Sequence, residues 1–398
     1  MDGSWWEKVF GNQTGPVSIT EQSSLGLSAV YACVRVLSED VAALPWNVHQ
    51  RTDRGNAVAY THPVQYLLHD QPHEWYSSFQ FRATMMAQVL LWGNAYARIY
   101  WNGISRPVGF KIYLPGTVDP YEHNSRIWYN TPDGVMASED IIHIAGLGFN
   151  GICGKSPIRT NAESLGVTLA AQRFGSNFFK NGANPSGALK HPKQLSAPAQ
   201  ARMKENFREK YMGLENTGEV LVLEEGMDYI KIGMPLEEAQ FIETRGFGKE
   251  DVCGMFRVPP HKIAKLDRAT FSNIEQQSLE YVMYSLMPWL VRFEQEFNRK
   301  VFYASEKGRV FNKFNVNALL RGDLAARQAF YQMMIQNGVF SQNDVRQYED
   351  LETFDGGDTR WIQQNMMPLD KALEILLAKS AAKAKGNGNP TAGNKNAA

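Results

Sequence analysis

The sequence contains few cysteines, and they do not form a recognisable set. Its 398 residues include only Cys33, Cys153 and Cys253, which lie about a hundred residues apart. A zinc site needs ligands paired at short spacing, and a disulfide framework in a small secreted domain needs an even set. The spacing therefore indicates neither, and we expect three buried, reduced thiols.

The sequence also lacks an excess of one charge and a long apolar run. Its 41 basic and 41 acidic side chains cancel, whereas a protein that coats nucleic acid carries a positive excess. Any contact with nucleic acid should therefore be local. No apolar run approaches the roughly 20 residues of a membrane span, and the opening MDGSWWEKVFG lacks a signal-peptide pattern. We expect a protein that is neither secreted nor embedded in a membrane.

Catalytic motifs are missing as well. No G-x-S-x-G elbow is present, so the sequence contains no nucleophilic-serine motif that would indicate a hydrolase. His69 and His73 are four residues apart, but Pro72 prevents them from sharing a helical face as in zinc proteases, so we expect surface loop positions. His143 alternates inward on a predicted strand and is interpreted as a hydrogen-bonded core residue. The sequence predicts no enzyme, cofactor or metal site.

One segment approaches a nucleotide-binding motif. FNGICGKS, residues 149–156, lies between a predicted strand and a helix, as a phosphate-binding P-loop would. Phe149 stands where the first glycine is required, and Pro157 removes a backbone donor from the helix start. A tight strand-to-helix turn is the preferred interpretation. An ATP-driven packaging or remodelling enzyme remains the alternative.

The periodicity predicts a mixed chain of two or three subdomains. Proline, glycine and N-capping residues give the expected boundaries. The predicted helices are 28–44, 78–92 (ended by Gly93), 157–180 (capped by Ser156), 198–212, 236–256, 272–302 (kinked at Pro288), 323–337 and 342–351 (capped by Ser341). The predicted strands are an antiparallel sheet over 94–146, then 187–190, VLVLE, YIKIG and 310–316.

The most informative stretch is VPPHKIAKLDRATFSNIEQQ, residues 258–277. Pro259 and Pro260 cannot continue a helix, and Ser272 with Glu275 predicts a capping box that begins the next one. Between them lie Lys262, Lys265 and Arg268 against the single acid Asp267. A loop of about a dozen residues in a compact chain is usually functional or disordered; we interpret this one as functional.

Charge is unevenly distributed in the module between helices 157–180 and 236–256. Residues 173–210 contain eight basic and two acidic side chains, whereas 215–225 contains four acids and no base. Two interpretations of this uneven charge are equally good. The charges form an ordinary solvated helix face, or they make complementary contact with an identical neighbour or an anionic partner.

Four segments in this order carry a family resemblance: NFFKNGANPSGAL, YMGLENTGEVLVLEEGMDY, FRVPPHKIAKLDRATFSNIEQ and LMPWLVRFEQEFNRKVF. Over about residues 20–355 the chain resembles the HK97-like portal proteins of tailed bacteriophages. The resemblance implies an α+β, mainly helical portal fold. Its expected parts are an N-terminal arm (1–24), a wing with an antiparallel β meander (25–155), a stem helix (156–182), an inserted α/β clip (183–235), a second stem helix (236–257), a tunnel loop (258–272), a kinked tunnel helix returning to the wing (273–318), a small helical crown (319–355) and a largely disordered tail (356–398).

The resemblance further implies a homo-oligomeric ring, typically of twelve subunits, at one capsid vertex. Such a ring is a conduit for DNA packaging and ejection. Expected partners are non-specific double-stranded DNA, the terminase large subunit, a head-completion or adaptor protein and the major capsid protein. The expected location is the virion, with assembly in the host cytoplasm. A capsid or connector component without a DNA channel remains a further alternative.

The resemblance assigns three sets of candidate residues. The tunnel loop of the DNA channel contributes Lys262, Lys265, Asp267, Arg268 and Thr270. The clip contributes candidates for motor docking, namely Lys190, Lys193, Arg202, Glu215 and Glu219. The expected helix hinges are Gly246, Gly248 and Pro288.

Overall fold

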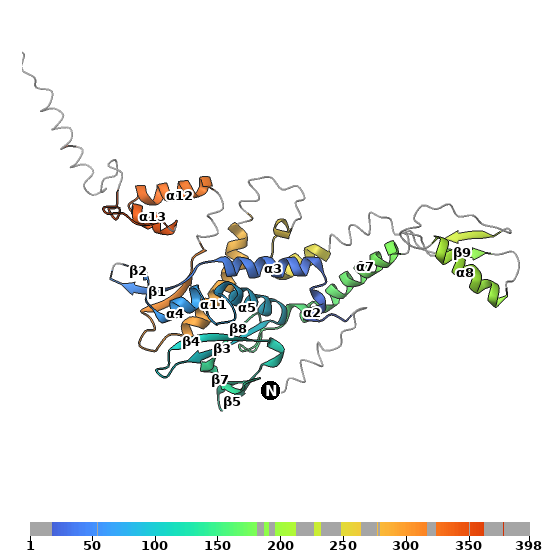
Figure 1. Ribbon diagram of the computed structural model, residues 1–398, viewed down its shortest axis with the longest axis horizontal. Helices are drawn as coiled ribbons and strands as arrows, with labels where there is room; N and C mark the ends of the chain where they lie inside the picture. The colour runs from blue at the N-terminus through green and yellow to red at the C-terminus, as the bar shows by residue number, and fades with distance from the viewer. Residues whose placement is uncertain are drawn as a thin grey trace, which may run out of the picture. The chain divides into compact units, whose positions relative to one another are not determined.

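A computed structural model describes most of the chain (Figure 1). The described residues are 18–53, 55–180, 187–190, 196–211, 227–231, 248–263, 277, 279–316, 324–349, 351–361 and 377. The chain divides into two compact units, Met1–Val316 and Asn317–Ala398. Within the described ranges, no helix combines the length and apolar character that a bilayer span requires.

The first unit contains most of the regular structure. Its helices are α2 (Glu21–Ser24), α3 (Ser28–Ala43), α4 (Pro63–His69), α5 (Ser78–Trp92), α6 (Pro157–Thr160), α7 (Ala162–Lys180), α8 (Ala197–Tyr211) and α11 (Met287–Lys300), with 3-10 turns η1 (Pro115–Thr117), η2 (Ser138–Asp140) and η4 (Pro260–Ile263) and the π-helical turn η5 (Tyr281–Leu286). Its strands are β1 (Trp46–Thr52), β2 (Gly55–Val58), β3 (Asn94–Trp101), β4 (Pro107–Tyr113), β5 (Asp119–His123), β6 (Arg126–Thr131), β7 (Gly134–Ala137), β8 (Ile141–Ala145), β9 (Gly187–Lys190), β10 (Asp228–Lys231) and β11 (Val310–Phe314).

Several predicted boundaries are confirmed. Helix α5 has the predicted bounds because Ser77 forms a capping box at its start and left-handed Gly93 ends it. Helix α3 ends one residue before the predicted boundary, just ahead of Pro45. Ser156 caps α6, as expected, but Asn161 interrupts the predicted helix between α6 and α7.

The expected single sheet over 94–146 is wrong in detail. The strands form two antiparallel sheets of three strands, in the orders β4-β3-β8 and β5-β6-β7. The prediction assumed that strands consecutive in the sequence pair with one another. Instead, β3 pairs with β8, and β5 belongs to a separate sheet. A third sheet, β11-β1-β2, joins residues far apart in the sequence; its β1–β2 hairpin and helix α4 were not predicted.

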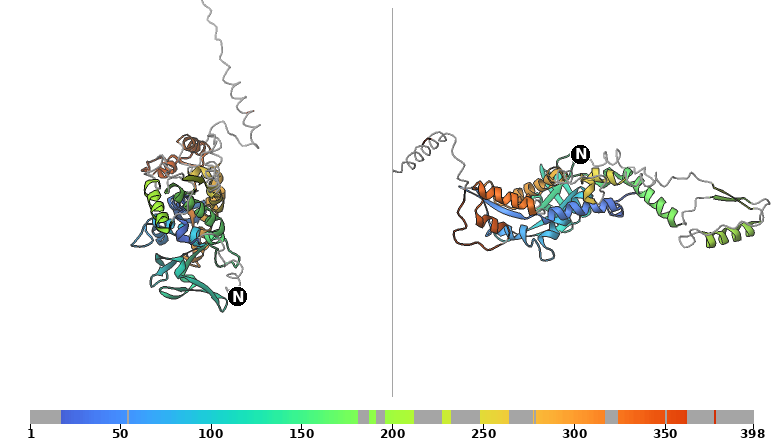
Figure 2. Two further views of the ribbon diagram at one scale, coloured as in Figure 1. Left: turned by 90° about the vertical axis from the view of Figure 1, so that its right-hand side faces the viewer. Right: turned by 90° about the horizontal axis from the view of Figure 1, so that it is seen from above.

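A helical layer and an aromatic core hold these sheets together. Helix α3 packs on α5, and α5 packs on β3 (Figures 1 and 2). The indole of Trp46 lies at the centre of the core, stacked on Phe314 at 4.6 Å between ring centroids and edge-on to Phe297 at 4.7 Å. Phe81 and Phe110 pack on the same Phe297 ring. These buried rings pack α5, α11 and strands β1, β4 and β11 against one another.

Helix α11 lies along the outer edge of β8 and bonds to it through side chains. Three α11 side chains at every fourth position bond to alternate β8 residues: Arg292 Nη1 donates to the Ala145 carbonyl at 2.6 Å, Glu296 Oε1 accepts from the His143 N–H at 3.0 Å, and Lys300 Nζ donates to the Ile141 carbonyl. Four helical residues rise about 6 Å, and two strand residues about 6.6 Å, so the two repeats match. The helix therefore occupies the place of a fourth strand.

Helix α11 also caps the β11 edge of the sheet β11-β1-β2. Glu294 Oε1 accepts from the Phe314 N–H at 2.8 Å, and Asn298 Oδ1 accepts from the Asn312 N–H at 2.8 Å. Asn312 in turn accepts the Trp46 indole N–H at 2.9 Å. Helix α11 thus satisfies backbone donors on the edge strands of two sheets and ties them into one body.

A buried polar network surrounds this junction. The Glu296 carboxylate bonds Lys300 Nζ at 2.7 Å and Arg299 at 2.6 Å. Burial raises the pKa of Glu296, but Lys300, the His143 N–H and Arg299 lower it more, so the group is ionised at neutral pH. These interactions fix the charge state on which the cap depends.

The second unit has a small core of its own. Helices α12 (Leu324–Gln336) and α13 (Gln342–Tyr348) are joined at Gly338, which is left-handed as its predicted C′ position requires. Ser341 forms the predicted cap of α13. The Glu349 carboxylate accepts the Tyr331 hydroxyl at 2.6 Å and pairs with Arg327 at 3.3 Å, which fastens the end of α13 to α12.

We expect Glu296→Ala to lower the free energy of unfolding by about 3–5 kcal/mol, because it leaves the Lys300 ammonium and a strand N–H buried without their partner. Urea unfolding followed by circular dichroism measures the loss. The matched control is Arg299→Ala, whose side chain is 62% exposed and which should cost less than about 1 kcal/mol. Equal losses for the two variants would contradict the edge cap.

Candidate functional site

The described part of the predicted tunnel loop begins at a distinctive helix end. Residues 248–256 are helical, and Arg257 then adopts a left-handed conformation with φ 55°. The Arg257 N–H bonds the Gly254 carbonyl at 3.2 Å, and the Val258 N–H bonds the Cys253 carbonyl at 2.9 Å. This pattern is a Schellman motif. The helix therefore ends before Pro259 and Pro260, which then open the 3-10 turn η4 instead of terminating the helix.

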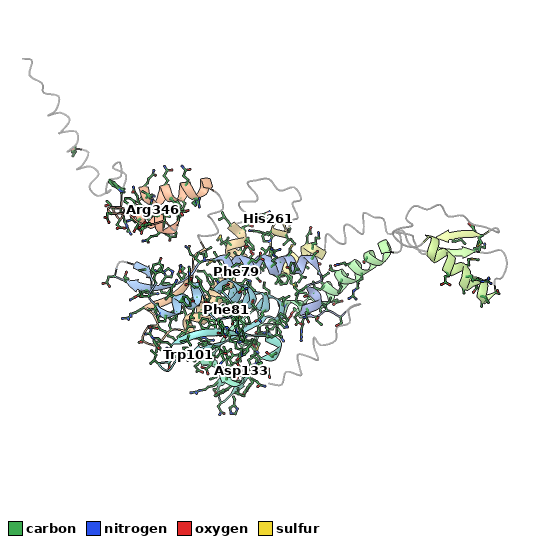
Figure 3. All side chains as sticks on the ribbon, viewed as in Figure 1. Phe79, Phe81, Trp101, Asp133, His261 and Arg346 are labelled. Atoms are coloured by element: carbon green, nitrogen blue, oxygen red, sulfur yellow. The ribbon has the colours of Figure 1, made fainter. Side chains whose placement is uncertain are left out.

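Lys262 lies on η4, against helix α3. Its ammonium lies over the Tyr281 ring, 4.9 Å from the centroid, and the Tyr281 hydroxyl donates to Asp40 of α3 at 2.8 Å. Burial and the nearby Asp40 raise the pKa of Tyr281, which keeps its hydroxyl a proton donor. Figure 3 labels the neighbouring His261 beside α3. Lys262 therefore anchors η4 through a cation–π contact.

The predicted kink at Pro288 takes the form of a π-helical turn. Pro288 stands at the start of α11, directly after η5. The Met287 N–H bonds the Val282 carbonyl, five residues back. Because proline has no N–H and clashes with the preceding turn, the helix widens there. The Ser285 hydroxyl donates to the Arg257 carbonyl, so this irregular turn contacts the end of helix 248–256.

Gly248 has a packing reason within the described structure. A Cβ at this position would lie 2.9 Å from the Thr168 methyl of α7, so glycine permits the two helices to approach closely. Its role as a hinge stays a prediction, as does that of Pro288.

The remaining predicted site residues are only partly described. Lys190 ends β9, where it pairs in register with Asp228 of β10, and Arg202 lies exposed on α8. These elements form a two-stranded antiparallel sheet and a helix, with the strands and helix near their predicted bounds. The other candidates lie outside the described residues: Lys193, Glu215, Glu219, Gly246, Lys265, Asp267, Arg268 and Thr270.

The FNGICGKS segment forms a closed turn. Asn150 Oδ1 accepts from the N–H groups of Ile152 and Cys153 at 3.0 and 2.9 Å. The Gly154 N–H bonds Asn94 Oδ1 at 2.8 Å, and the Lys155 N–H bonds the Leu147 carbonyl at 2.7 Å. Four successive backbone N–H groups of the segment, which a phosphate would need as donors, therefore already have partners. The predicted tight strand-to-helix turn is confirmed.

The histidines behave largely as expected. His143 is buried, with Nδ1 at 3.1 Å from the Tyr129 hydroxyl and Nε2 at 3.0 Å from Asn94 Oδ1, and burial lowers its pKa to about 3. The prediction of a hydrogen-bonded core histidine is confirmed, and burial keeps this histidine neutral. His69 is the last residue of α4 instead of a loop residue. The signal that the prediction did not use is Pro63 in the first turn of this helix. Among the described residues, no group of three metal-binding side chains comes together.

Comparisons with known proteins agree on one family. The family model described as "Phage portal protein" matches residues 28–350. The chain is 29% identical over 377 residues to the portal protein of Enterobacteria phage HK97, covering 90% of this chain and 89% of that protein. It is 32% identical over 360 residues to a probable portal protein of Streptomyces phage phiC31, covering 85% of this chain and 78% of that protein.

Solved structures show the same fold. A crystal structure of an HK97-family phage portal protein from Corynebacterium diphtheriae matches with a TM-score of 0.57 at 19% identity, covering 76% of this chain and 97% of that one. The neck of a native gene transfer agent particle, computed with C12 symmetry, matches with a TM-score of 0.53 at 19% identity, covering 87% of this chain and 99% of that one.

We expect Arg257→Gly to raise the free energy of unfolding by about 0.5–1 kcal/mol. Glycine removes the strain of a left-handed L-residue, and its greater freedom in the unfolded chain offsets part of the gain. Thermal and urea unfolding measure the change. Arg257→Ala is the control and should bring no such gain, because alanine retains a Cβ. A gain with alanine equal to that with glycine would show that the arginine side chain, and not the backbone conformation, is responsible.

Proposed function

The chain belongs to the phage portal protein family, and we propose that its copies close into a ring of twelve at one capsid vertex, through which DNA enters and leaves. The observation that carries this proposal is the family match across residues 28–350, which spans every predicted part from wing to crown. The C12 symmetry of the similar gene transfer agent neck supports the subunit number.

An exposed apolar stripe on the first unit supports assembly. Four exposed residues recur at every fourth position from just before η5 to the start of α11: Leu279, Met283, Met287 and Val291. Tyr284, beside them, is 63% exposed. One face of α11 buries Phe293 and Phe297 in the core, and its polar side chains contact the two sheet edges. A helix that carries a further, exposed apolar face normally meets a partner there. In the proposed ring, that partner is the neighbouring copy.

The proposed path of DNA follows the segment 258–272. A conduit must contact DNA without holding it, because each phosphate neutralised by the protein adds salt-dependent affinity. The equal numbers of basic and acidic residues suit this requirement. We assign the DNA-facing charge to Lys265 and Arg268, with Asp267 and Thr270 beside them. Lys262 contributes to the anchor of the loop through Tyr281.

The proposed docking surface for the packaging motor is the module around β9, α8 and β10. Its basic candidates are Lys190, Lys193 and Arg202, and its acidic candidates are Glu215 and Glu219. We propose that the terminase large subunit and later a head-completion protein bind here, and that the wing meets the major capsid protein. The protein then acts without catalysis, in the host cytoplasm during assembly and afterwards in the virion.

We expect the purified wild-type chain to form closed rings, and Met283→Asp with Met287→Asp to break them, because two charges per copy would be buried at each contact. Light scattering after size exclusion, with negative-stain microscopy, measures assembly. Tyr60→Asp, on another exposed apolar residue, is the control and should leave rings intact. A wild-type chain that is monomeric at all salt concentrations would overturn the ring; rings that persist in the double variant would remove only the stripe.

We expect Lys265→Ala with Arg268→Ala to reduce packaged DNA several-fold while rings still form, because the channel loses its positive belt. Nuclease-protected DNA per particle measures packaging. The charge-conserving variant Lys265→Arg with Arg268→Lys should package normally. Lys262→Ala is tested separately because it also removes the contact with Tyr281. Normal packaging by the double alanine variant would exclude the loop from a DNA role.

A further inference from the structure

The turn that follows β8 carries two exposed apolar side chains. Leu147 and Phe149 are 74% and 76% exposed, and we call this pair the apolar tip. The backbone beneath them is tightly closed, since a Cβ at Gly148 would lie 1.9 Å from the Cys153 carbonyl oxygen. The tip is therefore presented on a rigid support, which lowers the entropic cost of binding a partner.

An open groove lies between the end of α4 and the start of α5. Its volume is about 540 Å³, and its lining includes the exposed rings of Tyr66, Trp75 and Phe79, the last of which Figure 3 labels. The Trp75 ring lies edge-on to His73 at 4.7 Å between centroids, and the Tyr66 hydroxyl donates to Gln71 at 3.1 Å. Exposed tryptophan and tyrosine side chains that are already held in place are typical of surfaces that bind another protein.

The charges beside the tip and beside the groove have opposite signs. Lys155, whose N–H bonds the Leu147 carbonyl, and Arg292, which donates to the two carbonyls that precede the tip, are exposed. Asp70 and Glu74 line the groove and are exposed as well. The groove thus suits an apolar group flanked by cations, which is the character of the tip.

The tip and the groove lie at opposite ends of α5. Ser77, which caps the start of α5, lines the groove. At the other end, the Gly93 carbonyl accepts the Gly146 N–H, next to the tip, at 2.8 Å. The 15 residues of the helix span about 22 Å, so a chain cannot place its own tip in its own groove. Two copies side by side can, and contacts between unlike surfaces close into a ring when the rotation between copies permits.

We propose that the apolar tip of one copy inserts into the groove of the next copy, with the basic residues beside the tip facing Asp70 and Glu74. The occupant of the groove is thus a second copy of this chain. A Cβ on Gly146 would lie 3.7 Å from the Trp289 ring of α11, so the tip adjoins the exposed apolar stripe already assigned to subunit contact. This inference rests on the proposed ring and adds which two surfaces meet.

The test places one cysteine on each surface of the full-length chain. Of the natural cysteines, Cys33 and Cys253 are buried, as the sequence predicted, but Cys153 is partly exposed, so Cys153→Ser is the background. Phe149→Cys and Trp75→Cys copies are co-expressed, and the assembled protein is treated with a short bis-maleimide. We expect covalent dimers from the mixture and monomers from either variant alone. A chain that carries both substitutions should give a ladder of covalent oligomers.

Several results would overturn this contact. Dimers from either variant alone would show that like surfaces meet, and cross-links from Trp75→Cys to another capsid component in whole particles would assign the groove to that component. Negative-stain microscopy of the same samples separates the two levels of the proposal. Rings without cross-links overturn the contact alone, whereas a wild-type chain that forms no rings overturns the ring and the contact together.

An apolar-to-charged variant measures how much the contact contributes to assembly. We expect Phe149→Asp to raise the protein concentration at half-assembly about tenfold or more, because a carboxylate would enter an aromatic groove. Val135→Asp, on an exposed apolar residue of β7, is the matched control and should assemble as the wild type does. Thermal unfolding of both variants shows that each is folded. Assembly of Phe149→Asp at the wild-type concentration would contradict the proposal.

Discussion

The use of helix α11 in place of a strand is the constraint on which the first unit depends. The outer edges of β8 and β11 would otherwise present unpaired backbone groups, which invite pairing with other chains. Alternate strand residues and every fourth helical residue advance by nearly the same distance, so one helix can serve a strand through long polar side chains. Arg292, Glu296 and Lys300 do this for β8, and Glu294 and Asn298 for β11.

This constraint explains the irregular turn before α11. The side chains that cap the sheets fix the rotation of α11 about its axis. A regular α-helix running into α11 would therefore have the directions of its own side chains fixed as well. The π-helical turn η5 changes this rotation, at the position where Pro288 already removes a hydrogen bond. With this rotation, the Tyr281 hydroxyl donates to Asp40 and the Ser285 hydroxyl donates to the Arg257 carbonyl. The contact between Lys262 and Tyr281 is thus a consequence of how α11 closes the edges of β8 and β11.

Local signals were sufficient to predict those elements whose ends are set by a few neighbouring residues. The capping box at Ser77 and left-handed Gly93 determine α5, and Ser341 determines the start of α13. Sequence reasoning did not find the features made by distant residues. The spacing of Glu296 and Lys300 resembles an ordinary solvated helix face, and only the fold shows that it meets β8. Arg257 likewise gives no sign of a left-handed residue, because glycine is the usual signal.

The contact between Lys262 and Tyr281 lies at the two ends of the segment that we propose contacts DNA. Lys262 precedes residues 264–276 and Tyr281 follows them, and the Lys262 ammonium lies over the Tyr281 ring, so the residues that flank this segment are held together beside α3. Lys265 and Arg268 against Asp267 leave one net positive charge per copy. In the ring proposed above, one such charge per copy would give a weak positive belt, which would attract the phosphate backbone without the many fixed contacts that would stop DNA from sliding.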